Sequence, residues 1–295
     1  MRREGMSLVT RRAACLDELL PVRADMSRRN LFAGLAIAAT ATLALAGCAT
    51  GSSDAGSGGE SAAGDEYGLI EAGKLTVCSD IPYPPFEFEG DDGEYTGFDI
   101  DLLGAIAEQL DLELSVQDVG FDALQSGTTL AAGQCDIGAS AMTITDERKA
   151  NIDFSDPYYD SLQSLLVRTD SGIKSIDDLD GKNVGVQQGT TGEAYATENA
   201  KGAQLVQYPS DGELWPAMQA GQIDAILQDQ PVNLEHEKAD SAYEIVETYE
   251  TDESYGFAFA KGEKDELREA VNGALQELRD NGEYDTIYNE YFTAN

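Results

Sequence analysis

Arg148 stands in a short polar segment, AMTITDERK (141–149), that follows the apolar run DIGAS. Thr145 can cap a helix that begins at Asp146, and the free backbone N–H groups at such a helix start favour an anion. The guanidinium of Arg148 adds a charged pair of donors that fits a carboxylate. A second loop before a predicted helix, GTTG (189–192), can supply further N–H groups. The two segments therefore predict a carboxylate-binding site.

Asp229 supplies the opposite charge and suits an ammonium group. The segments leading to Arg148 and to Asp229 share a pattern, because AGQCDI (132–137) and AGQIDA (220–225) both place a helix-ending glycine before an apolar strand. This pattern can also reflect the cap geometry alone. Ligands of open α/β sheets bind beyond the carboxyl ends of the strands, where both residues then lie. A carboxylate clamp and a separate acid match an α-amino acid, whose two charges both need partners when buried.

Strands and helices alternate throughout the part of the chain that follows residue 74. The predicted strands are 75–79, 94–98, 112–116, 135–140, 182–186, 205–208 and 223–228. One predicted helix is capped by Asp99, and a second covers 123–132. A third begins in the loop 189–192, and a fourth covers 212–220. This order indicates an α/β fold with largely parallel sheets, and its repetition indicates two halves built from the same local unit.

Residues 26–65 have the composition of an export signal and a tether, whereas residues 1–25 show no feature of export. A basic start at Met26 precedes an apolar run, 31–46, which is short for a membrane span and fits a signal-peptide core. The Arg28-Arg29 pair leaves open whether export follows the twin-arginine or the general secretory route. Residues LAGC, ending at Cys48, resemble the lipobox of bacterial lipoproteins.

We therefore expect residues 1–47 to be a signal peptide, with translation starting at Met26. Cleavage would leave a lipidated Cys48 at the start of a flexible tether, 48–65, whose small polar residues cannot bury enough surface to order themselves.

The 295-residue chain has a formal net charge of −36, which argues against nucleic acid as a partner, because phosphate binding needs a basic surface. The one histidine, His236, lies in the charged run EHEK and is expected to be solvated, so neither a metal cluster nor a Ser-His-Asp set is predicted. We expect no metal and no cofactor. Cys78 and Cys135 can form a disulfide outside the cytoplasm or remain buried thiols, and the sequence leaves both open.

Several segments together resemble family 3 of the bacterial extracellular solute-binding proteins, the amino-acid receptors of ABC importers. They are SDIPYPPFEF (79–88), GFDIDLL (97–103), SAMTITDERK (140–149), DFSDPYY (153–159), VGVQQGTTG (184–192), AGQIDAILQDQ (220–230) and NGEYDTIYNEYF (281–292). The likeness covers residues 68–292. It implies a two-lobed, type II periplasmic-binding-protein-like α/β fold, in which each lobe is a mainly parallel sheet flanked by helices and the ligand lies in the cleft between the lobes.

The resemblance also implies where the lobes divide. Lobe 1 would comprise 66–161 plus 254–295 and lobe 2 would comprise 166–250. Hinge strands near 162–165 and 251–253 would join them and let the lobes close on the ligand.

The resemblance further implies the ligand-binding roles. Arg148 would hold the α-carboxylate, and Asp229 would hold the α-ammonium. The residues that would assist the carboxylate clamp are Thr143 and the backbone around Gly189, Thr190 and Thr191. The other pocket residues would be the aromatics Tyr83 and Phe121, the floor residues Ser140, Ala141 and Met142, and Asp80 at the edge. The segment 121–140 is longer than the usual form, and Ala141 stands where many members have glycine or serine.

The implied function is capture of an L-amino acid by hinge closure and delivery to the permease subunits of an ABC importer with its cytoplasmic ATPase. Because Arg148 is the one cation at these pocket positions and Asp80 is acidic, we expect a polar neutral or basic amino acid. The protein would be a monomer, lipid-anchored at the outer face of the cytoplasmic membrane, and not an enzyme. A cyclohexadienyl or arogenate dehydratase on the same fold and a ligand-sensing receptor domain remain as alternatives.

Overall fold

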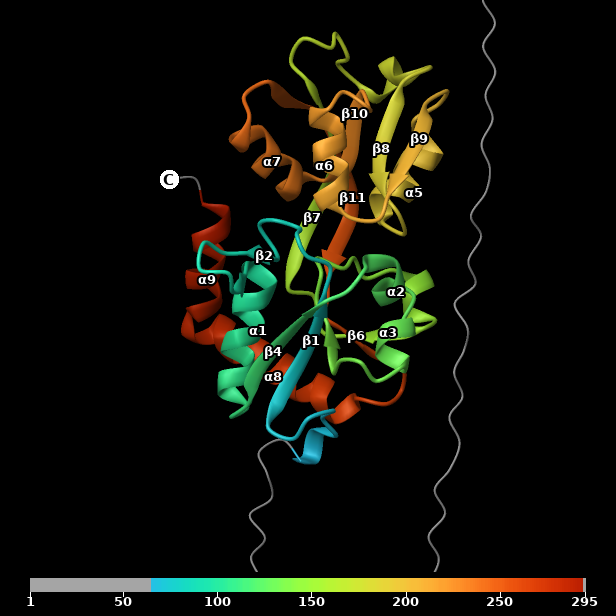
Figure 1. Cartoon of the computed structure of the whole chain (residues 1–295). Helices are drawn as coiled ribbons and strands as arrows, with labels where there is room; N and C mark the ends of the chain where they lie inside the picture. Colours follow the sequence, from blue (N-terminus) through green and yellow to red (C-terminus); the bar gives the residue numbers. More distant parts are fainter. Residues whose placement is uncertain (1–64, 294–295) are drawn as a thin grey trace, which may run out of the picture. The chain divides into compact units, whose positions relative to one another are not determined.

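The computed structural model describes residues 65–293, which form two α/β lobes joined by long strands (Figure 1). Each lobe has one five-stranded sheet, with strand orders β4-β1-β5-β12-β6 and β11-β7-β10-β8-β9. Both sheets are mixed, because β12 in the first and β7 in the second run antiparallel to both neighbours. The two-lobed α/β fold implied by the sequence is therefore confirmed.

The strands have the following bounds. Across the first sheet they are β4 (Glu113–Asp118), β1 (Lys74–Ser79), β5 (Ile137–Gly138), β12 (Ala258–Ala260) and β6 (Ile152–Phe154). Across the second sheet they are β11 (Tyr243–Tyr255), β7 (Tyr159–Arg168), β10 (Ala225–Asp229), β8 (Asn183–Gln187) and β9 (Gln204–Tyr208). A separate antiparallel pair is formed by β2 (Phe88–Glu89) and β3 (Tyr95–Thr96).

Helices flank both sheets. Those of the first lobe are α1 (Phe98–Gln109), α2 (Phe121–Gln125), α3 (Thr128–Ala131), α4 (Asp146–Lys149), α8 (Asp265–Asn281) and α9 (Glu283–Phe292). Those of the second lobe are α5 (Thr191–Asn199), α6 (Asp211–Gln219) and α7 (Gln230–Ala239). Two short 3-10 helices are η1 (Asp65–Tyr67) and η2 (Ile176–Leu179). Within residues 65–293, no helix combines the length and apolar character that crossing a membrane requires.

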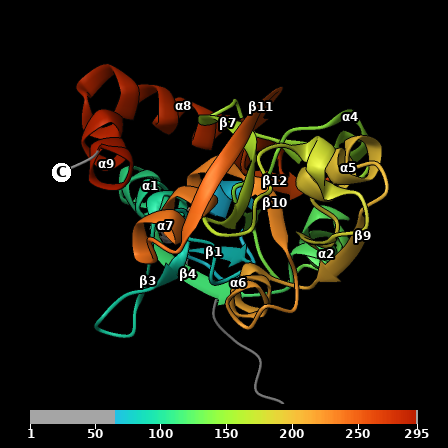
Figure 2. The same ribbon diagram turned by 90° about the horizontal axis from the view of Figure 1, so that it is seen from above.

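Strands β7 and β11 run side by side from one lobe to the other (Figures 1 and 2). Tyr159, at the start of β7, packs against the aromatic core of the first lobe, whereas Leu165 belongs to the core of the second. The segments predicted as hinges, 162–165 and 251–253, lie within these two strands. The lobe boundaries themselves stay predictions.

Helix α1 begins differently from the prediction, which made Asp99 its cap. The N-cap is Gly97, whose φ of 126° is open to glycine and strained for other residues. A Cβ at Gly97 would lie 2.2 Å from the carbonyl oxygen of Phe86. Asp99 is instead fully buried, and accepts hydrogen bonds from the Tyr158 hydroxyl (2.7 Å) and the Ala141 N–H (2.9 Å). An aspartate near a helix start commonly caps the helix. Here the Asp99 carboxylate bonds to distant residues instead.

The predicted helix 123–132 is two short helices, α2 and α3, separated at Gly127. Gly127 has φ of 79°, and a Cβ there would lie 2.7 Å from a methyl of Ile152. Both the backbone conformation and the close approach of strand β6 favour glycine at this position. Two predicted strands are also shorter than expected, since 94–98 contains only β3 and 135–140 contains only β5.

His236 is buried rather than solvated, with 5% of its surface exposed. Its ring stacks on Trp215 with 4.2 Å between centroids, and its Nε2 lies 3.0 Å from a carboxylate oxygen of Asp211. Two of its charged neighbours on α7, Glu235 and Lys238, instead pair with each other at 2.7 Å, which the sequence run EHEK could not reveal.

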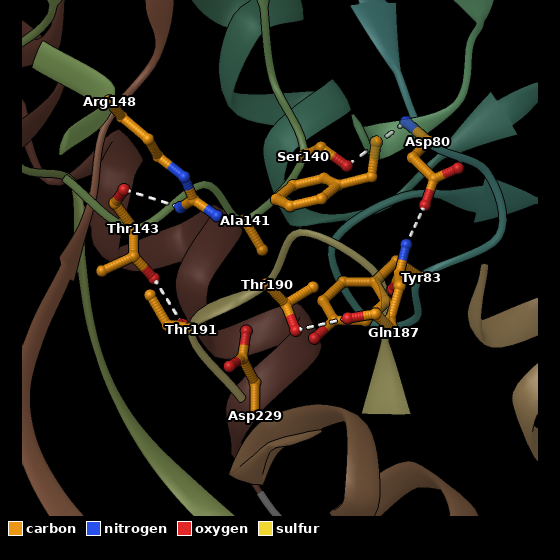
Figure 3. A pocket seen from close by; sticks show the side chains of 11 residues that line it. Asp80, Tyr83, Ser140, Ala141, Thr143, Arg148, Gln187, Thr190, Thr191 and Asp229 are labelled. Atoms are coloured by element: carbon orange, nitrogen blue, oxygen red, sulfur yellow. Dashed lines mark hydrogen bonds between the residues drawn. The ribbon is translucent and has the colours of Figure 1, made fainter. Parts of the chain in front are cut away.

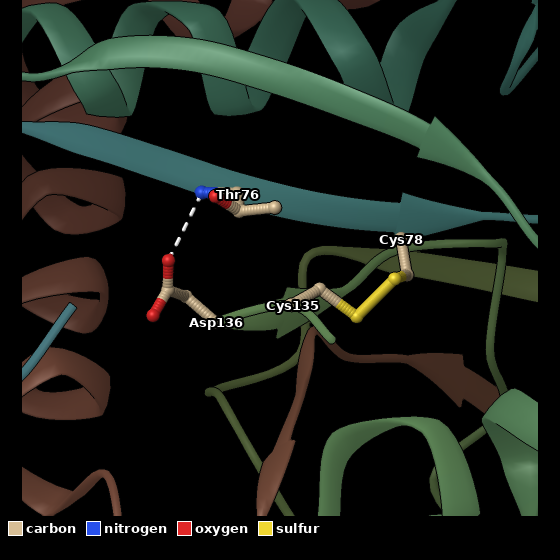
Figure 4. The surroundings of a disulfide bond; sticks show 4 residues. All are labelled: Thr76, Cys78, Cys135 and Asp136. Atoms are coloured by element: carbon tan, nitrogen blue, oxygen red, sulfur yellow. Dashed lines mark hydrogen bonds between the residues drawn. A yellow bond between two sulfur atoms is a disulfide. The ribbon is translucent and has the colours of Figure 1, made fainter. Parts of the chain in front are cut away.

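A disulfide joins Cys78 on β1 to Cys135, just before β5 (Figure 4). Both cysteines are buried, and their Cα atoms are 5.7 Å apart. Beside the bond, Asp136 accepts a hydrogen bond from the Thr76 N–H at 3.1 Å. Both interactions fix β1 against β5, and these are the strands that lead to Asp80 and to the segment 140–148. Cys48 and the predicted signal peptide and tether lie outside the described residues.

We expect peptide mapping of the unreduced protein to recover Cys78 and Cys135 in one linked fragment. Replacing both by alanine should lower the free energy of unfolding by up to about 4 kcal/mol, because the bond closes a loop of 57 residues. Urea unfolding of the variant and of the unaltered protein measures this difference. Recovery of the two cysteines in separate, alkylated peptides would show that the thiols are free.

Candidate ligand-binding site

The pocket between the lobes is lined by eleven residues (Figure 3). The first lobe contributes Asp80, Tyr83, Phe121, Ser140, Ala141, Thr143 and Arg148, and the second contributes Gln187, Thr190, Thr191 and Asp229. Apart from Met142 and Gly189, every residue predicted to bind ligand is therefore brought together here. Met142 lies fully buried behind the pocket wall in a cluster with Phe121, so its predicted place in the floor is not observed.

Arg148 lies on α4 with 5% of its surface exposed. As predicted, Thr145 is the N-cap of this helix, and its hydroxyl accepts a hydrogen bond from the Arg148 N–H at 3.1 Å. The guanidinium donates to the carbonyl oxygen of Thr143 at 2.8 Å and to that of Gly189, on the opposite lobe, at 3.0 Å. It also lies over the ring of Phe121 at 5.2 Å.

The charge of Arg148 is not matched by a direct ion pair among the residues the structure describes. Burial lowers the pKa of Arg148 to about 10, so the group stays positive at neutral pH. A buried, positive guanidinium that donates to two neutral carbonyls can also bind a carboxylate, which would match its charge.

Asp229 is the last residue of β10. It therefore lies at the carboxyl end of a strand, where ligands of α/β sheets are expected to bind. Its carboxylate accepts hydrogen bonds of 2.5 Å from the Gln163 side-chain amide and of 2.5 Å from the Tyr255 hydroxyl. Burial, followed by the nearby negative charge of Glu253, raises the pKa of Asp229 to about 7. An incoming ammonium group would reverse this effect, because it stabilises the ionised form.

Asp80 lies just beyond the end of β1 and accepts a 2.6 Å hydrogen bond from the side chain of Gln187, across the cleft. Burial raises the pKa of Asp80 to about 7. Gln187 is the last residue of β8 and was missed in the sequence, although the same rule of strand ends would have selected it. Asp80 and Gln187 together offer a carboxyl and an amide at a place separate from Asp229.

The pocket floor, Ser140 and Ala141, is held from below by two buried acids. The Ser140 hydroxyl donates to Glu87 at 2.5 Å, and the Ala141 N–H donates to Asp99 at 2.9 Å. Burial raises the pKa of Glu87 well above its usual range and that of Asp99 to about 7. Ala141 has φ of 42°, a left-handed conformation that favours glycine, which gives a physical reason why glycine suits this position.

The two lobes touch directly around the pocket. Besides the bonds from Arg148 to Gly189 and from Gln187 to Asp80, the hydroxyls of Thr143 and Thr191 lie 3.4 Å apart. These contacts join residues on opposite lobes, so the structure is in a closed arrangement. Within residues 65–293, no group of three His, Cys, Asp or Glu side chains gathers in the geometry of a metal site.

The sequence model described as "Bacterial extracellular solute-binding proteins, family 3" matches residues 75–294. The chain belongs to this family. It is 36% identical over 228 residues to the L-cystine-binding protein TcyJ of Escherichia coli (strain K12), covering 76% of this chain and 84% of TcyJ. It is 35% identical over 266 residues to the arginine-binding extracellular protein ArtP of Bacillus subtilis (strain 168), covering 88% of this chain and 97% of ArtP.

Solved structures agree with this assignment. An ancestral arginine-binding protein bound to arginine superposes with a TM-score of 0.70 at 38% sequence identity, covering 75% of this chain and 99% of that one. At this identity and coverage, the chain shares its two-lobed fold with that protein.

The raised pKa of Asp229 predicts that a ligand carrying an ammonium group binds more weakly in acid. The ammonium pairs with the ionised carboxylate, which is fully present above a pKa of about 7 and is lost below it. Affinity should therefore be highest near pH 8, where the ligand's amino group is still protonated, and fall about tenfold per pH unit below pH 7. Titration calorimetry across this range measures the change with an amino acid of neutral side chain, which gives Asp80 no charge to pair with. Asp229→Asn should then abolish most of the pH dependence. An affinity that stays constant down to pH 5.5 contradicts the prediction.

Proposed function

We propose that this protein captures a free α-amino acid outside the cytoplasm and delivers it to the permease subunits of an ABC importer. One observation carries the proposal: Arg148 and Asp229, buried and of opposite charge, face one pocket from opposite lobes. A zwitterion bridging them would match both charges, and leaving either one unmatched would cost several kcal/mol. The names of the relatives, an L-cystine-binding and an arginine-binding protein, support an amino acid as ligand.

The ligand class that fits best is a basic or a polar neutral amino acid. Asp80 can pair with a cationic side chain, and Gln187 can hydrogen-bond a neutral one. Tyr83 and Phe121 offer aromatic faces to the aliphatic part of such a side chain. Among the described lining residues, Arg148 is the one cation, so the side-chain carboxylate of glutamate or aspartate would have no charged partner.

Binding would close the lobes about the crossing strands. In this proposal, lobe 1 comprises 66–161 plus 254–295, and lobe 2 comprises 166–250. The hinges lie near 162–165 and 251–253. A ligand can contact Arg148 on one lobe and Asp229 on the other at the same time only when the lobes are closed. It therefore binds the closed arrangement more tightly than an open one and favours it. The closed form is then the one that docks on the permease, whose ATPase drives uptake.

The location follows from the sequence. Cleavage at the lipobox would leave Cys48 lipidated, and the tether 48–65 would keep a monomeric receptor at the outer face of the cytoplasmic membrane. We propose that the protein acts by binding alone, without turnover.

Titration of the unfolded-and-refolded protein against the twenty amino acids should identify one or a few tight, one-to-one ligands among arginine, lysine, histidine and glutamine. Refolding removes ligand carried through purification, and calorimetry reports affinity and stoichiometry together. Tighter binding of glutamate than of these amino acids would contradict the reading of Asp80 and Gln187. Turnover of prephenate or arogenate would favour the dehydratase alternative, and transport that is unchanged when the protein is deleted would favour a sensing role.

Arg148→Ala should weaken amino-acid binding at least about 100-fold, because the ligand carboxylate loses its charged partner in a buried site. Arg168→Ala, which removes an exposed arginine of the second lobe, should leave binding unchanged. Calorimetry measures affinity, and thermal unfolding checks that both variants fold. Binding by folded Arg148→Ala within a few-fold of the unaltered protein would exclude Arg148 as the carboxylate partner.

A further inference from the structure

Glu253 is a buried carboxylate on the crossing strand β11, and the sequence did not single it out. It is 8% exposed. Between the paired residues Tyr249–Gln163 and Glu253–Ser161, the strand β11 has three residues where β7 has one. Asp252 within this bulge has φ of 53°. Bulges next to functional sites commonly redirect a side chain, and this one precedes the residue that reaches the cleft.

Every hydrogen bond to the Glu253 carboxylate comes from a side chain in or beside the pocket. Its Oε2 accepts from the Thr143 hydroxyl at 2.8 Å and from the Thr191 hydroxyl at 2.8 Å. The Gln163 side-chain amide contacts its two oxygens at 3.2 and 3.3 Å. The two threonines line the pocket from opposite lobes, whereas Glu253 and Gln163 are not among the lining residues. Glu253 therefore lies behind the pocket wall and acts through the threonines.

The chemistry of a carboxylate fixes the direction of these bonds. An ionised carboxylate only accepts, whereas a hydroxyl has a single proton and two lone pairs. Once Thr143 and Thr191 each give that proton to Glu253, only acceptor lone pairs remain toward the pocket. The same logic orients Gln163, because its neighbours Asp229 and Glu253 are both carboxylates and must face its NH₂ group.

The acceptors left in the pocket lie close to one another. The Thr143 and Thr191 hydroxyl oxygens are 3.4 Å apart. The Gln163 amide that donates to Asp229 also donates to the Thr191 hydroxyl at 3.4 Å, which leaves that oxygen one lone pair for the ligand. Figure 3 shows the two threonines between Arg148 and Asp229. A primary ammonium has three N–H donors, and Asp229 with the two hydroxyls supplies three acceptors, drawn from both lobes.

We propose that Glu253 is a positioning residue that turns the Thr143 and Thr191 hydroxyls into acceptors for the ligand's ammonium group. The ligand's carboxylate is then left to Arg148 and to backbone N–H groups. This inference rests on the proposed function and changes the part of Thr143 in it, because the family resemblance assigns Thr143 to the carboxylate. Glu253 thereby makes recognition of the ammonium depend on both lobes, which couples that group to closure.

The test removes one hydroxyl and compares ligands that lack one charged group each. Thr191→Val replaces the hydroxyl by a methyl of similar shape. The probes are L-arginine, L-argininamide, which keeps the ammonium, and 5-guanidinopentanoic acid, which keeps the carboxylate. If the screen selects another amino acid, its amide and its des-amino acid replace them. Calorimetry gives each affinity for the unaltered and the variant protein.

Thr191→Val should weaken L-arginine and L-argininamide about tenfold each, and should leave 5-guanidinopentanoic acid unchanged. In the reverse pattern, the affinity for the des-amino acid would fall and that for the amide would not. This would show that the hydroxyl donates to the carboxylate. It would overturn the role of Glu253 and leave the proposed function standing. Failure of the unaltered protein to bind any amino acid would overturn the proposed function and this inference together.

Glu253→Gln tests the positioning residue directly. Its new NH₂ group can donate to a threonine hydroxyl, so that hydroxyl can turn its proton toward the pocket. L-arginine affinity should fall at least about tenfold, with a smaller loss for 5-guanidinopentanoic acid. Glu250→Gln, an exposed acid on the same strand, is the matched control and should bind like the unaltered protein. Equal L-arginine affinities of Glu253→Gln and Glu250→Gln would overturn the proposal. If Glu253→Gln does not fold, Thr191→Val still provides the test.

Discussion

The need to match buried charges governs the arrangement of this molecule. Arg148 and Asp229 carry opposite charges, lie on different lobes, and are each almost fully removed from water. Neither has a direct ion pair among the described residues, and each is held by neutral hydrogen-bonding groups. A ligand that brings both a carboxylate and an ammonium satisfies the two together. Because the two charges lie on separate lobes, we propose that the same ligand stabilises the closed arrangement.

The scaffold of the first lobe keeps the floor of this site rigid. The disulfide between Cys78 and Cys135 and the bond from Thr76 to Asp136 hold β1 against β5. Beneath the floor, Glu87 and Asp99 take the free hydrogen-bond donors of Ser140 and Ala141. Burial raises the pKa of both acids, so each is easier to protonate than a surface acid. Rigid strand ends and satisfied backbone groups keep the lining residues in place.

The crossing strands do more than connect the lobes. Three of their side chains lie behind the lining residues. Gln163 on β7 and Tyr255 on β11 donate hydrogen bonds to Asp229. Glu253 on β11 accepts hydrogen bonds from the two pocket threonines. In the proposed function, the predicted hinge is therefore also the place where the polarity of the ammonium site would be set. A change in the relative position of the lobes would alter these bonds directly, which links ligand recognition to closure through short, identifiable contacts.

Local chemistry in the sequence determined the parts of this protein that depend on neighbouring residues. The cap at Thr145, the strand end at Asp229 and the alternation of strands and helices could all be predicted, because each depends on a few adjacent positions. Asp99 and His236 were assigned wrongly, since their burial depends on Tyr158, Trp215 and Asp211 from distant segments. Glu253 became visible only in the folded chain, and Gln187, whose strand end the sequence could have selected, found its partner Asp80 only there. Their roles depend on which side chains meet across the cleft, and only the tertiary structure decides that, because it brings residues of two lobes within hydrogen-bonding distance.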